Sequence, residues 1–257
     1  MPDERRIELE VEVLGTPEQV WQAIATGPGI SSWYVPHQVE EREGGAATAR
    51  FGPGPEMEVP GRVAAWDPPT RVVFDGGEPG EGLAFEWLIE ARDGGTCIVR
   101  LVNTGFGSGE DWDAQYDGMI EGWTLFLRNL QLHLEHFPGR HATPSLPTAA
   151  VSGTRDEVWA ALIAALGIDP LPQVGDRIEV DSDDAPTLAG TVADVETGRL
   201  ALMVDAPAEG TAFIAAEGAG DQTSVSIWTY LYGPEGAAAA IRDEPRWQAW
   251  LAEHIRP

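Results

Sequence analysis

One polar residue follows an otherwise apolar alternating series. Asn103 comes after Val99 and Leu101 at every second position of a segment whose alternation predicts a β-strand. The pattern places Asn103 in the interior, where an amide needs hydrogen-bond partners. We therefore expect Asn103 either to bind a ligand or to hold the turn before Gly105.

Two histidines have a spacing that can suit a metal ion. His133 and His136 are three residues apart in a predicted helix, so they share a face. No third ligand accompanies them, and the apolar face of the helix directs them mostly toward solvent, so no metal site is predicted. His37 is expected at the surface or, alternatively, at the mouth of a cavity.

The sequence carries no recognisable nucleophile. It lacks G-x-S-x-G, and its single cysteine, Cys97, has no evident histidine or arginine partner to lower its pKa. A P-loop and a G-x-G-x-x-G turn are also absent. With 42 acidic residues, counting cannot single out an acid–base pair. No catalytic residue and no cofactor are predicted, and whether the protein is an enzyme stays open.

Hydrophobic periodicity predicts the elements that must position these residues. Residues 7–13 alternate apolar side chains with glutamate, and a helix over 17–26 begins at a Thr16 cap. Short turns separate the strands that follow, which implies an antiparallel sheet. These strands are expected near 37–43, 46–52, 57–66, 70–75, 83–91 and 96–104.

The clearest element is a long helix. Apolar residues recur every three or four positions from Trp112 to Phe137, which predicts a helix of about 26 residues. Gly118 and Gly122 lie inside it, although glycine in a helix costs about 1 kcal/mol relative to alanine. We expect them to provide room where the helix crosses the concave face of the sheet.

Two parts of the chain resemble each other. The segments GTPEQVWQAI from Gly15 and GTRDEVWAAL from Gly153 both predict a capped helix. Downstream, the pair Ala84-Phe85 matches Ala212-Phe213, and Thr96 matches Thr223. The sequence therefore predicts two related domains, residues 1–137 and a shorter one over 146–257 whose final helix is interrupted at Pro245. The proline-rich segment 138–145 is predicted to link them.

The order of strand, capped helix, meander and long helix resembles the START-like helix-grip (SRPBCC) superfamily. Within it, the chain is most similar to domains of the activator of heat-shock-protein ATPase homologues. The resemblance covers about residues 7–137, and 146–257 resembles a shortened copy. It implies an α+β fold with two helix-grip domains, each a curved antiparallel sheet wrapped around a C-terminal helix. The motifs that carry it are VWQAI, ISSWYVP, PGRVAAWDPPTRVVF, GGTCIVRLVNTGF and GWTLFLRNLQLHLEHF.

This resemblance also implies a cavity between the sheet and the long helix, used to hold small, mostly apolar molecules. Apolar side chains with a few polar groups are typical of such a pocket. Each candidate has an alternative role as packing in a closed core. The candidate ligand-binding residues are Phe51, Met57, Phe74, Phe85, Trp87, Val99, Leu101, Asn103, Tyr116, Met119 and Trp123.

Charge and composition exclude several classes of protein. The chain of 257 residues has a net charge of −26, and all its cations are arginine. This charge repels nucleic acids and anionic membranes. No apolar run of about 18 residues is present, so no membrane span is predicted. One cysteine excludes a disulfide within the chain, which favours the cytoplasm, and the arginine-only composition is typical of a GC-rich bacterium.

The leading hypothesis is binding of a small hydrophobic molecule in the first domain, without identified catalysis. Tandem START-like domains also resemble polyketide aromatase/cyclases, so an enzyme of that type is an alternative. Regulation of a chaperone ATPase is a second alternative, although the additional domain of the members that act on the chaperone has no counterpart here. Whether the chain has a protein partner is left open.

The charge gives a first testable expectation. Because acidic residues are spread over both halves of the chain, the protein should not retain DNA at physiological salt. A filter-binding or gel-shift assay measures this directly, and measurable retention would contradict the interpretation.

Overall fold

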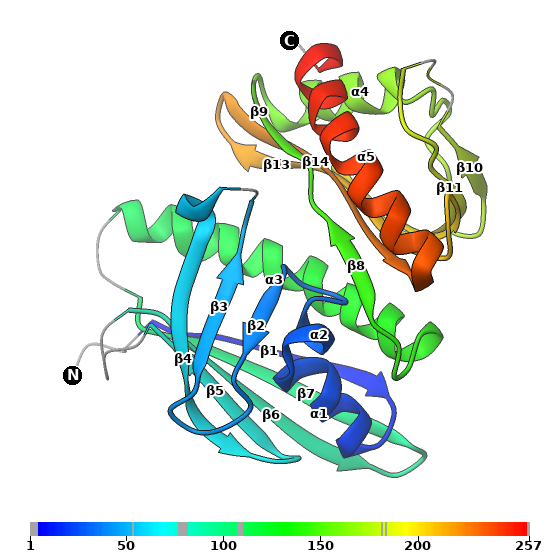
Figure 1. Cartoon of the computed structure of the whole chain (residues 1–257). Helices are drawn as coiled ribbons and strands as arrows, with labels where there is room; N and C mark the ends of the chain where they lie inside the picture. Colours follow the sequence, from blue (N-terminus) through cyan, green and yellow to red (C-terminus); the bar gives the residue numbers. More distant parts are fainter. Residues whose placement is uncertain are drawn as a thin grey trace. The chain divides into compact units, whose positions relative to one another are not determined.

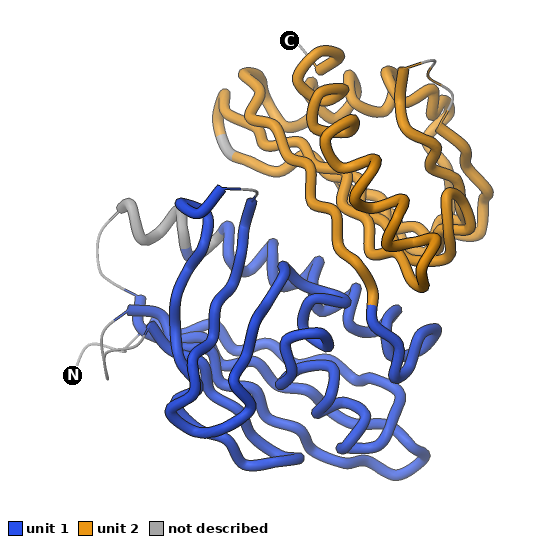
Figure 2. The backbone as a smooth tube through the Cα atoms, in the orientation of Figure 1, with its two compact units in different colours: residues 1–141 blue, residues 142–257 orange. Residues whose placement is uncertain are grey.

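The computed structural model describes residues 5–52, 54–76, 82–106, 110–180, 182 and 184–255. The chain divides into two compact units, residues 1–141 and residues 142–257 (Figure 2). We call them unit 1 and unit 2.

Unit 1 contains a seven-stranded antiparallel sheet in the order β1-β7-β6-β5-β4-β3-β2. Strands β2 to β7 follow one another as a meander, and β1 pairs with the last of them. The expected strands are present, and the first of the meander is shorter than predicted. The strands are β1 (Ile7–Leu14), β2 (His37–Val39), β3 (Ala46–Arg50), β4 (Glu58–Asp67), β5 (Arg71–Asp75), β6 (Ala84–Arg92) and β7 (Thr96–Thr104).

The long helix α3 (Glu110–His136) runs across one face of this sheet and packs along β1 (Figure 1). Two hydrogen bonds join it to the N-terminal strand region. Gln131 Nε2 donates to the Glu12 carbonyl at 3.0 Å, and the Tyr116 hydroxyl donates to the Arg6 carbonyl at 2.9 Å. The sheet and helix together form the helix-grip arrangement expected from the sequence.

Shorter helices complete unit 1. Helix α1 (Pro17–Ala25) starts at a capping box, in which Thr16 and Gln19 each accept a hydrogen bond from the other's backbone N–H. It buries Trp21, whose ring meets Trp66 edge to face with centroids 4.8 Å apart. Helix α2 (Gly27–Ile30) follows, and η1 (Pro55–Met57) is a single 3₁₀ turn.

Unit 2 repeats this plan with one strand fewer after its first helix. Its antiparallel sheet has the order β10-β11-β12-β13-β14, and β8 and β9 both pair with β14. The helices are α4 (Arg155–Ala165), which starts at a Thr154 and Glu157 capping box, and α5 (Gly233–His254). The strands are β8 (Ala142–Ser145), β9 (Thr148–Ser152), β10 (Arg177–Glu179), β11 (Ala189–Glu196), β12 (Arg199–Ala206), β13 (Gly210–Ala219) and β14 (Gln222–Tyr232).

The segment predicted as a linker is partly structured. Residues 142–145 form β8 and pair with the end of β14, so they belong to the sheet of unit 2. Strands β8 and β9 are the two halves of one first strand, separated at Leu146 and Pro147. Proline lacks the N–H that a continuous ladder needs, which explains the interruption.

The predicted interruption of the last helix is wrong. Helix α5 continues through Pro245, and Trp247, Trp250 and Leu251 beyond it are all buried. The proline removes the hydrogen bond to the carbonyl of Ile241, one turn earlier. Ile241 is 72% exposed, so that stretch of the helix borders solvent, which can hydrate the carbonyl.

The two units share an unusual backbone feature before their capped helices. Gly15 and Gly153 have φ angles of +126° and +125°, which side chains rarely adopt. Each glycine carbonyl accepts a hydrogen bond from the strand beside it, from Cys97 Sγ at 3.4 Å in unit 1 and from Thr223 Oγ1 at 2.8 Å in unit 2. Cys97, rather than Thr96, is therefore the counterpart of Thr223.

The other sequence match, of Ala84-Phe85 with Ala212-Phe213, is also shifted by one residue. Three residues separate the paired ends of β6 and β7, but only two separate those of β13 and β14. Phe85 lies opposite Asn103, and the corresponding cross-strand pair in unit 2 is Ala212 with Thr229. Because neighbouring residues of a strand face opposite sides, Phe213 does not take the place of Phe85.

Trp21 and Trp159 occupy equivalent buried positions on α1 and α4, with 5% and 9% exposure. Replacing either with Ala should lower the free energy of unfolding of its unit by roughly 3–5 kcal/mol, since a large aromatic side chain is removed from a core. Urea unfolding of the full chain followed by circular dichroism measures the loss. Phe at either position should cost less, and a loss below about 1 kcal/mol for Ala would contradict the assignment of these helix faces.

Candidate functional site

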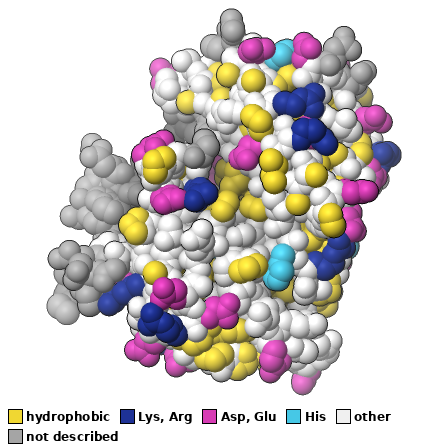
Figure 3. Space-filling model, in the orientation of Figure 1, with side chains coloured by type: hydrophobic (Ala, Val, Ile, Leu, Met, Phe, Trp, Pro, Cys, Tyr) yellow, Lys and Arg dark blue, Asp and Glu magenta, His cyan; other side chains and the backbone are white. Residues whose placement is uncertain are grey.

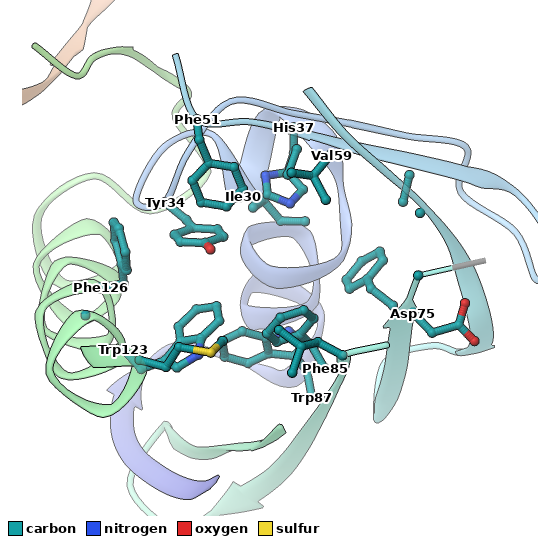
Figure 4. Close-up of a pocket in the computed structure, with 18 of the residues that line it drawn as sticks. Ile30, Tyr34, His37, Phe51, Val59, Asp75, Phe85, Trp87, Trp123 and Phe126 are labelled. Carbon is teal, nitrogen blue, oxygen red and sulfur yellow. The ribbon is translucent and has the colours of Figure 1, made fainter. Parts of the chain in front are cut away.

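Unit 1 contains a cavity of about 590 Å³ between α3 and the part of the sheet formed by β3 to β6 (Figure 4). Helices α1 and α2 and the segment after α2 close another side of it. Its walls are mostly apolar. The lining residues are Ile24, Ile30, Trp33, Tyr34, His37, Ala47, Ala49, Phe51, Val59, Pro60, Gly61, Phe74, Asp75, Gly76, Leu83, Phe85, Trp87, Gly118, Met119, Gly122, Trp123 and Phe126.

Aromatic rings form much of this wall. Trp123 lies at the centre of the group, with ring centroids 4.9 Å from Tyr34, 5.5 Å from Trp87 and 5.7 Å from Phe85. The contacts with Trp87 and Phe85 are edge to face, an arrangement that aromatic pairs prefer. Such a wall can hold a flat apolar molecule by the same kinds of ring contact.

Two glycines of α3 leave space on the helix side. Gly118 and Gly122 both line the cavity, and a Cβ added to either would have no heavy atom within 4 Å. The room expected at these glycines from the sequence is therefore present.

Six of the eleven residues proposed from the sequence line the cavity. They come from β5, from β6, from the position just after β3 and from α3. They are Phe51, Phe74, Phe85, Trp87, Met119 and Trp123.

Two of the remaining five belong to the closed core. Val99 and Leu101 are fully buried in β7, which lies between β1 and β6. The cavity lies over β3 to β6, whereas β7 lies beyond them, next to the strand along which α3 packs. The proposal that these two residues line the cavity is wrong for that reason.

Two further candidates are directed elsewhere. Tyr116 uses its hydroxyl to bind the Arg6 carbonyl, and its ring packs edge to face on Phe106 at 5.1 Å. Met57 lies in η1 and is 39% exposed. Neither is among the lining residues.

Asn103 has a structural role rather than a place in the cavity wall. It is fully buried, and its Nδ2 donates to the carbonyl of Ala84 at 3.0 Å, which ties the end of β7 to the start of β6. It does not line the cavity. Its Oδ1 has no hydrogen-bond partner among the described residues.

Sequence reasoning missed the segment that runs from the end of α2 into the start of β2. Trp33, Tyr34 and His37 all line the cavity, and surface placement of His37 is wrong. These residues fall within or next to ISSWYVP, one of the motifs that carries the family resemblance. No hydrophobic periodicity marks a segment this short, so the pattern gave no indication of where its side chains point.

The environment of His37 defines its protonation. Its ring Nδ1 lies 2.8 Å from the carbonyl of Val35, so Nδ1 carries the proton and donates. Burial lowers the pKa of His37 to about 4, against a smaller opposing effect of that hydrogen bond. At neutral pH the ring is therefore uncharged, and its Nε2 is a hydrogen-bond acceptor.

Three other ionisable groups are unsuited to acid–base or nucleophilic work. Burial raises the pKa of the Tyr34 phenol, which keeps it protonated. The Asp75 carboxylate is bound by Arg62 through two hydrogen bonds of 2.9 and 3.1 Å and points away from the rings in Figure 4. Burial also raises the pKa of the Cys97 thiol, which leaves it a poor nucleophile.

Within the described ranges, no group of three or more His, Cys, Asp or Glu side chains could hold a metal ion. His133 is buried rather than directed to solvent as expected. No helix in the described part of the chain is long and apolar enough to cross a membrane.

Comparison with known proteins agrees with this architecture. The family model "Activator of Hsp90 ATPase homolog 1-like protein" matches residues 15–135, which is most of unit 1 and no part of unit 2. Unit 1 has the fold of this family. None of the curated proteins compared with the chain is significantly similar to it.

Several solved structures are similar to the chain at low sequence identity. The di-domain ARO/CYC BexL from the BE-7585A biosynthetic pathway is 16% identical, with 98% of each chain covered and a TM-score of 0.45. The Aha1 dimer from Colwellia psychrerythraea is 21% identical over 51% of this chain and 97% of that one, with a TM-score of 0.43. The protein MLL2253 from Mesorhizobium loti is 18% identical over 52% and 98%, with a TM-score of 0.44.

The state of His37 can be tested by NMR. We expect its imidazole nitrogens to show the Nδ1–H tautomer at pH 7 and a titration midpoint near 4. The unfolded chain takes up this proton near pH 6.5, so the contribution of His37 makes the folded state less stable as the pH falls from 6.5 to 4. The variant His37→Gln assigns the signal, and a midpoint near 6.5 would contradict the buried placement.

Proposed function

We propose that unit 1 binds a small aromatic molecule in the cavity between α3 and the sheet. The observation that supports this most is the cavity itself, about 590 Å³ with eight aromatic side chains in its wall. Cavities of about 300–1,000 Å³ with mostly apolar walls are usual for small-molecule sites. A closed core would be expected to fill such a volume with side chains.

Exposed apolar residues at the cavity support the same proposal. Phe51 is 44% exposed and Val59 is 54% exposed, and both are lining residues. An apolar side chain left in water contributes nothing to folding, whereas a bound apolar molecule would cover it. Ligand binding explains why these positions are apolar.

Binding is favoured over catalysis by the polar groups available. A histidine with a pKa near 4 is a weak base at neutral pH, and Asp75 is already paired with Arg62. An activity like that of the aromatase/cyclases would need a stronger base inside the cavity. Regulation of a chaperone ATPase gains no support from any residue of the cavity.

We infer that unit 2 does not contribute an equivalent site. Trp247, Trp250 and Leu251 of α5 belong to one continuous buried cluster with α4 and the inner face of the sheet. At the position of Phe85, unit 2 has the small residue Ala212, which lies in the same cluster. Helix α5 thus packs directly onto the sheet of unit 2, which is consistent with a structural or regulatory role for this unit.

Gly118→Leu tests the cavity. The leucine should occupy the space beside Gly118 and weaken binding of the neutral fluorescent probe N-phenyl-1-naphthylamine at least tenfold. Leucine is a better helix former than glycine, so the helix itself should not be destabilised. Fluorescence titration gives the dissociation constant, which we expect in the micromolar range for wild type.

Thr124→Leu is the matched control. Thr124 is exposed on the same helix and does not line the cavity, so the same side chain added there should leave the dissociation constant unchanged. Circular dichroism and thermal melting show whether each variant is folded. Equal binding by wild type and a folded Gly118→Leu, or no binding by wild type, would reject the proposal.

A further inference from the structure

We propose that one end of the cavity recognises a neutral hydroxyl group on the aromatic ligand, through Tyr34 and His37. This inference rests on the proposed function of unit 1 and defines the chemical class of its ligand. Tyr34 lies in the short segment between α2 and β2, and His37 is the first residue of β2; their ring centroids are 5.4 Å apart. Figure 4 shows the Tyr34 hydroxyl and the His37 ring facing the space between the aromatic walls.

His37 offers the cavity an acceptor that none of the described residues uses. Its Nδ1 is bound to the Val35 carbonyl, and no described residue hydrogen-bonds to its Nε2. A neutral imidazole that donates through Nδ1 has a lone pair on Nε2. This lone pair borders a mostly apolar cavity, where a ligand O–H group could donate a hydrogen bond to it.

Tyr34 offers a donor beside that acceptor. Its hydroxyl makes no hydrogen bond to any described residue. The ring is held by Phe126 at 4.4 Å, edge to face, and by Trp123 at 4.9 Å. The phenol is protonated, so it can donate to a ligand oxygen.

The segment that carries both groups is held in place before any ligand binds. The backbone N–H of His37 donates to Ser31 Oγ at 2.9 Å, and Ser31 Oγ donates to the Gly27 carbonyl at 2.7 Å. Asn129 of α3 donates to the Trp33 carbonyl at 3.0 Å. Fixed polar groups lose little entropy when a ligand binds, which increases their contribution to affinity.

A hydroxyl is the group that satisfies both side chains. Its hydrogen can be donated to His37 Nε2 while its oxygen accepts from Tyr34. An ether or ketone can accept from Tyr34 but leaves Nε2 without a donor. A carboxylate also lacks a donor, and it would approach a lone pair in a chain of net charge −26. On the face shown in Figure 3, acidic side chains are scattered over both units.

The test compares four ligands that share one ring system. Naphthalene, 2-naphthol, 2-methoxynaphthalene and 2-naphthoate are titrated against the full chain by displacement of N-phenyl-1-naphthylamine. We expect 2-naphthol to bind about three- to tenfold more tightly than naphthalene or 2-methoxynaphthalene, as one or two added hydrogen bonds would produce. 2-Naphthoate should bind most weakly.

Variants assign the preference to the two residues. Tyr34→Phe removes only the hydroxyl and keeps the ring in its aromatic contacts, so it should reduce the advantage of 2-naphthol and leave naphthalene unchanged. His37→Phe should do the same. Because that change also leaves the Val35 carbonyl without its donor, a second measurement on wild type follows the ¹⁵N signal of His37 Nε2, which should shift when 2-naphthol is added but not when naphthalene is added.

The outcomes separate this inference from the proposed function. If naphthalene and 2-naphthol bind equally in wild type and Tyr34→Phe, the cavity binds aromatic molecules without recognising a hydroxyl, and the inference is wrong. If no naphthalene compound binds, the proposed function fails and the inference with it. A selective loss of 2-naphthol affinity in Tyr34→Phe supports both.

Discussion

The packing of α3 against β1 is the interaction on which the cavity depends. The C-terminal half of the helix is buried along this contact, and Gln131 and Tyr116 bind backbone carbonyls of the N-terminal strand region. The helix is thereby fixed at one edge of the sheet, and it need not close onto β3–β6. Space remains because Gly118 and Gly122 put no side chain into it. A helix fixed along only one side is therefore the physical basis of the cavity.

Unit 2 follows the same plan, but its last helix packs into one continuous buried cluster with the sheet. Its last helix brings Trp247 and Trp250 into the core, and these rings meet edge to face at 5.6 Å. The strand position that carries Phe85 in unit 1 carries Ala212. Ala212 of the sheet and both tryptophans of the helix lie in one continuous buried cluster, so the two surfaces meet directly there. The difference between the units lies in where the large side chains are placed, because both retain the capped helix and the glycine before it.

Local patterns predict the elements of this chain well, because caps and periodicity act over a few residues. The capping boxes at Thr16 and Thr154 and the long apolar stripe are examples. The same patterns cannot predict which strand lies under the cavity. Alternation assigns Val99 and Phe85 to one face of the sheet, but the strand order decides that only Phe85 borders the open space. The register between the two repeats depends on the turn between β13 and β14, which is one residue shorter than the turn between β6 and β7. His37 lies in a segment too short to show hydrophobic periodicity.

Several residues around the cavity are unfavourable for stability. Two glycines in a helix interior cost about 1 kcal/mol each relative to alanine, and Phe51 and Val59 leave apolar surface exposed. A fold selected for stability alone would place larger residues on α3 and polar ones at the rim. Departures from local rules that gather around one space are expected where a protein needs that space for binding.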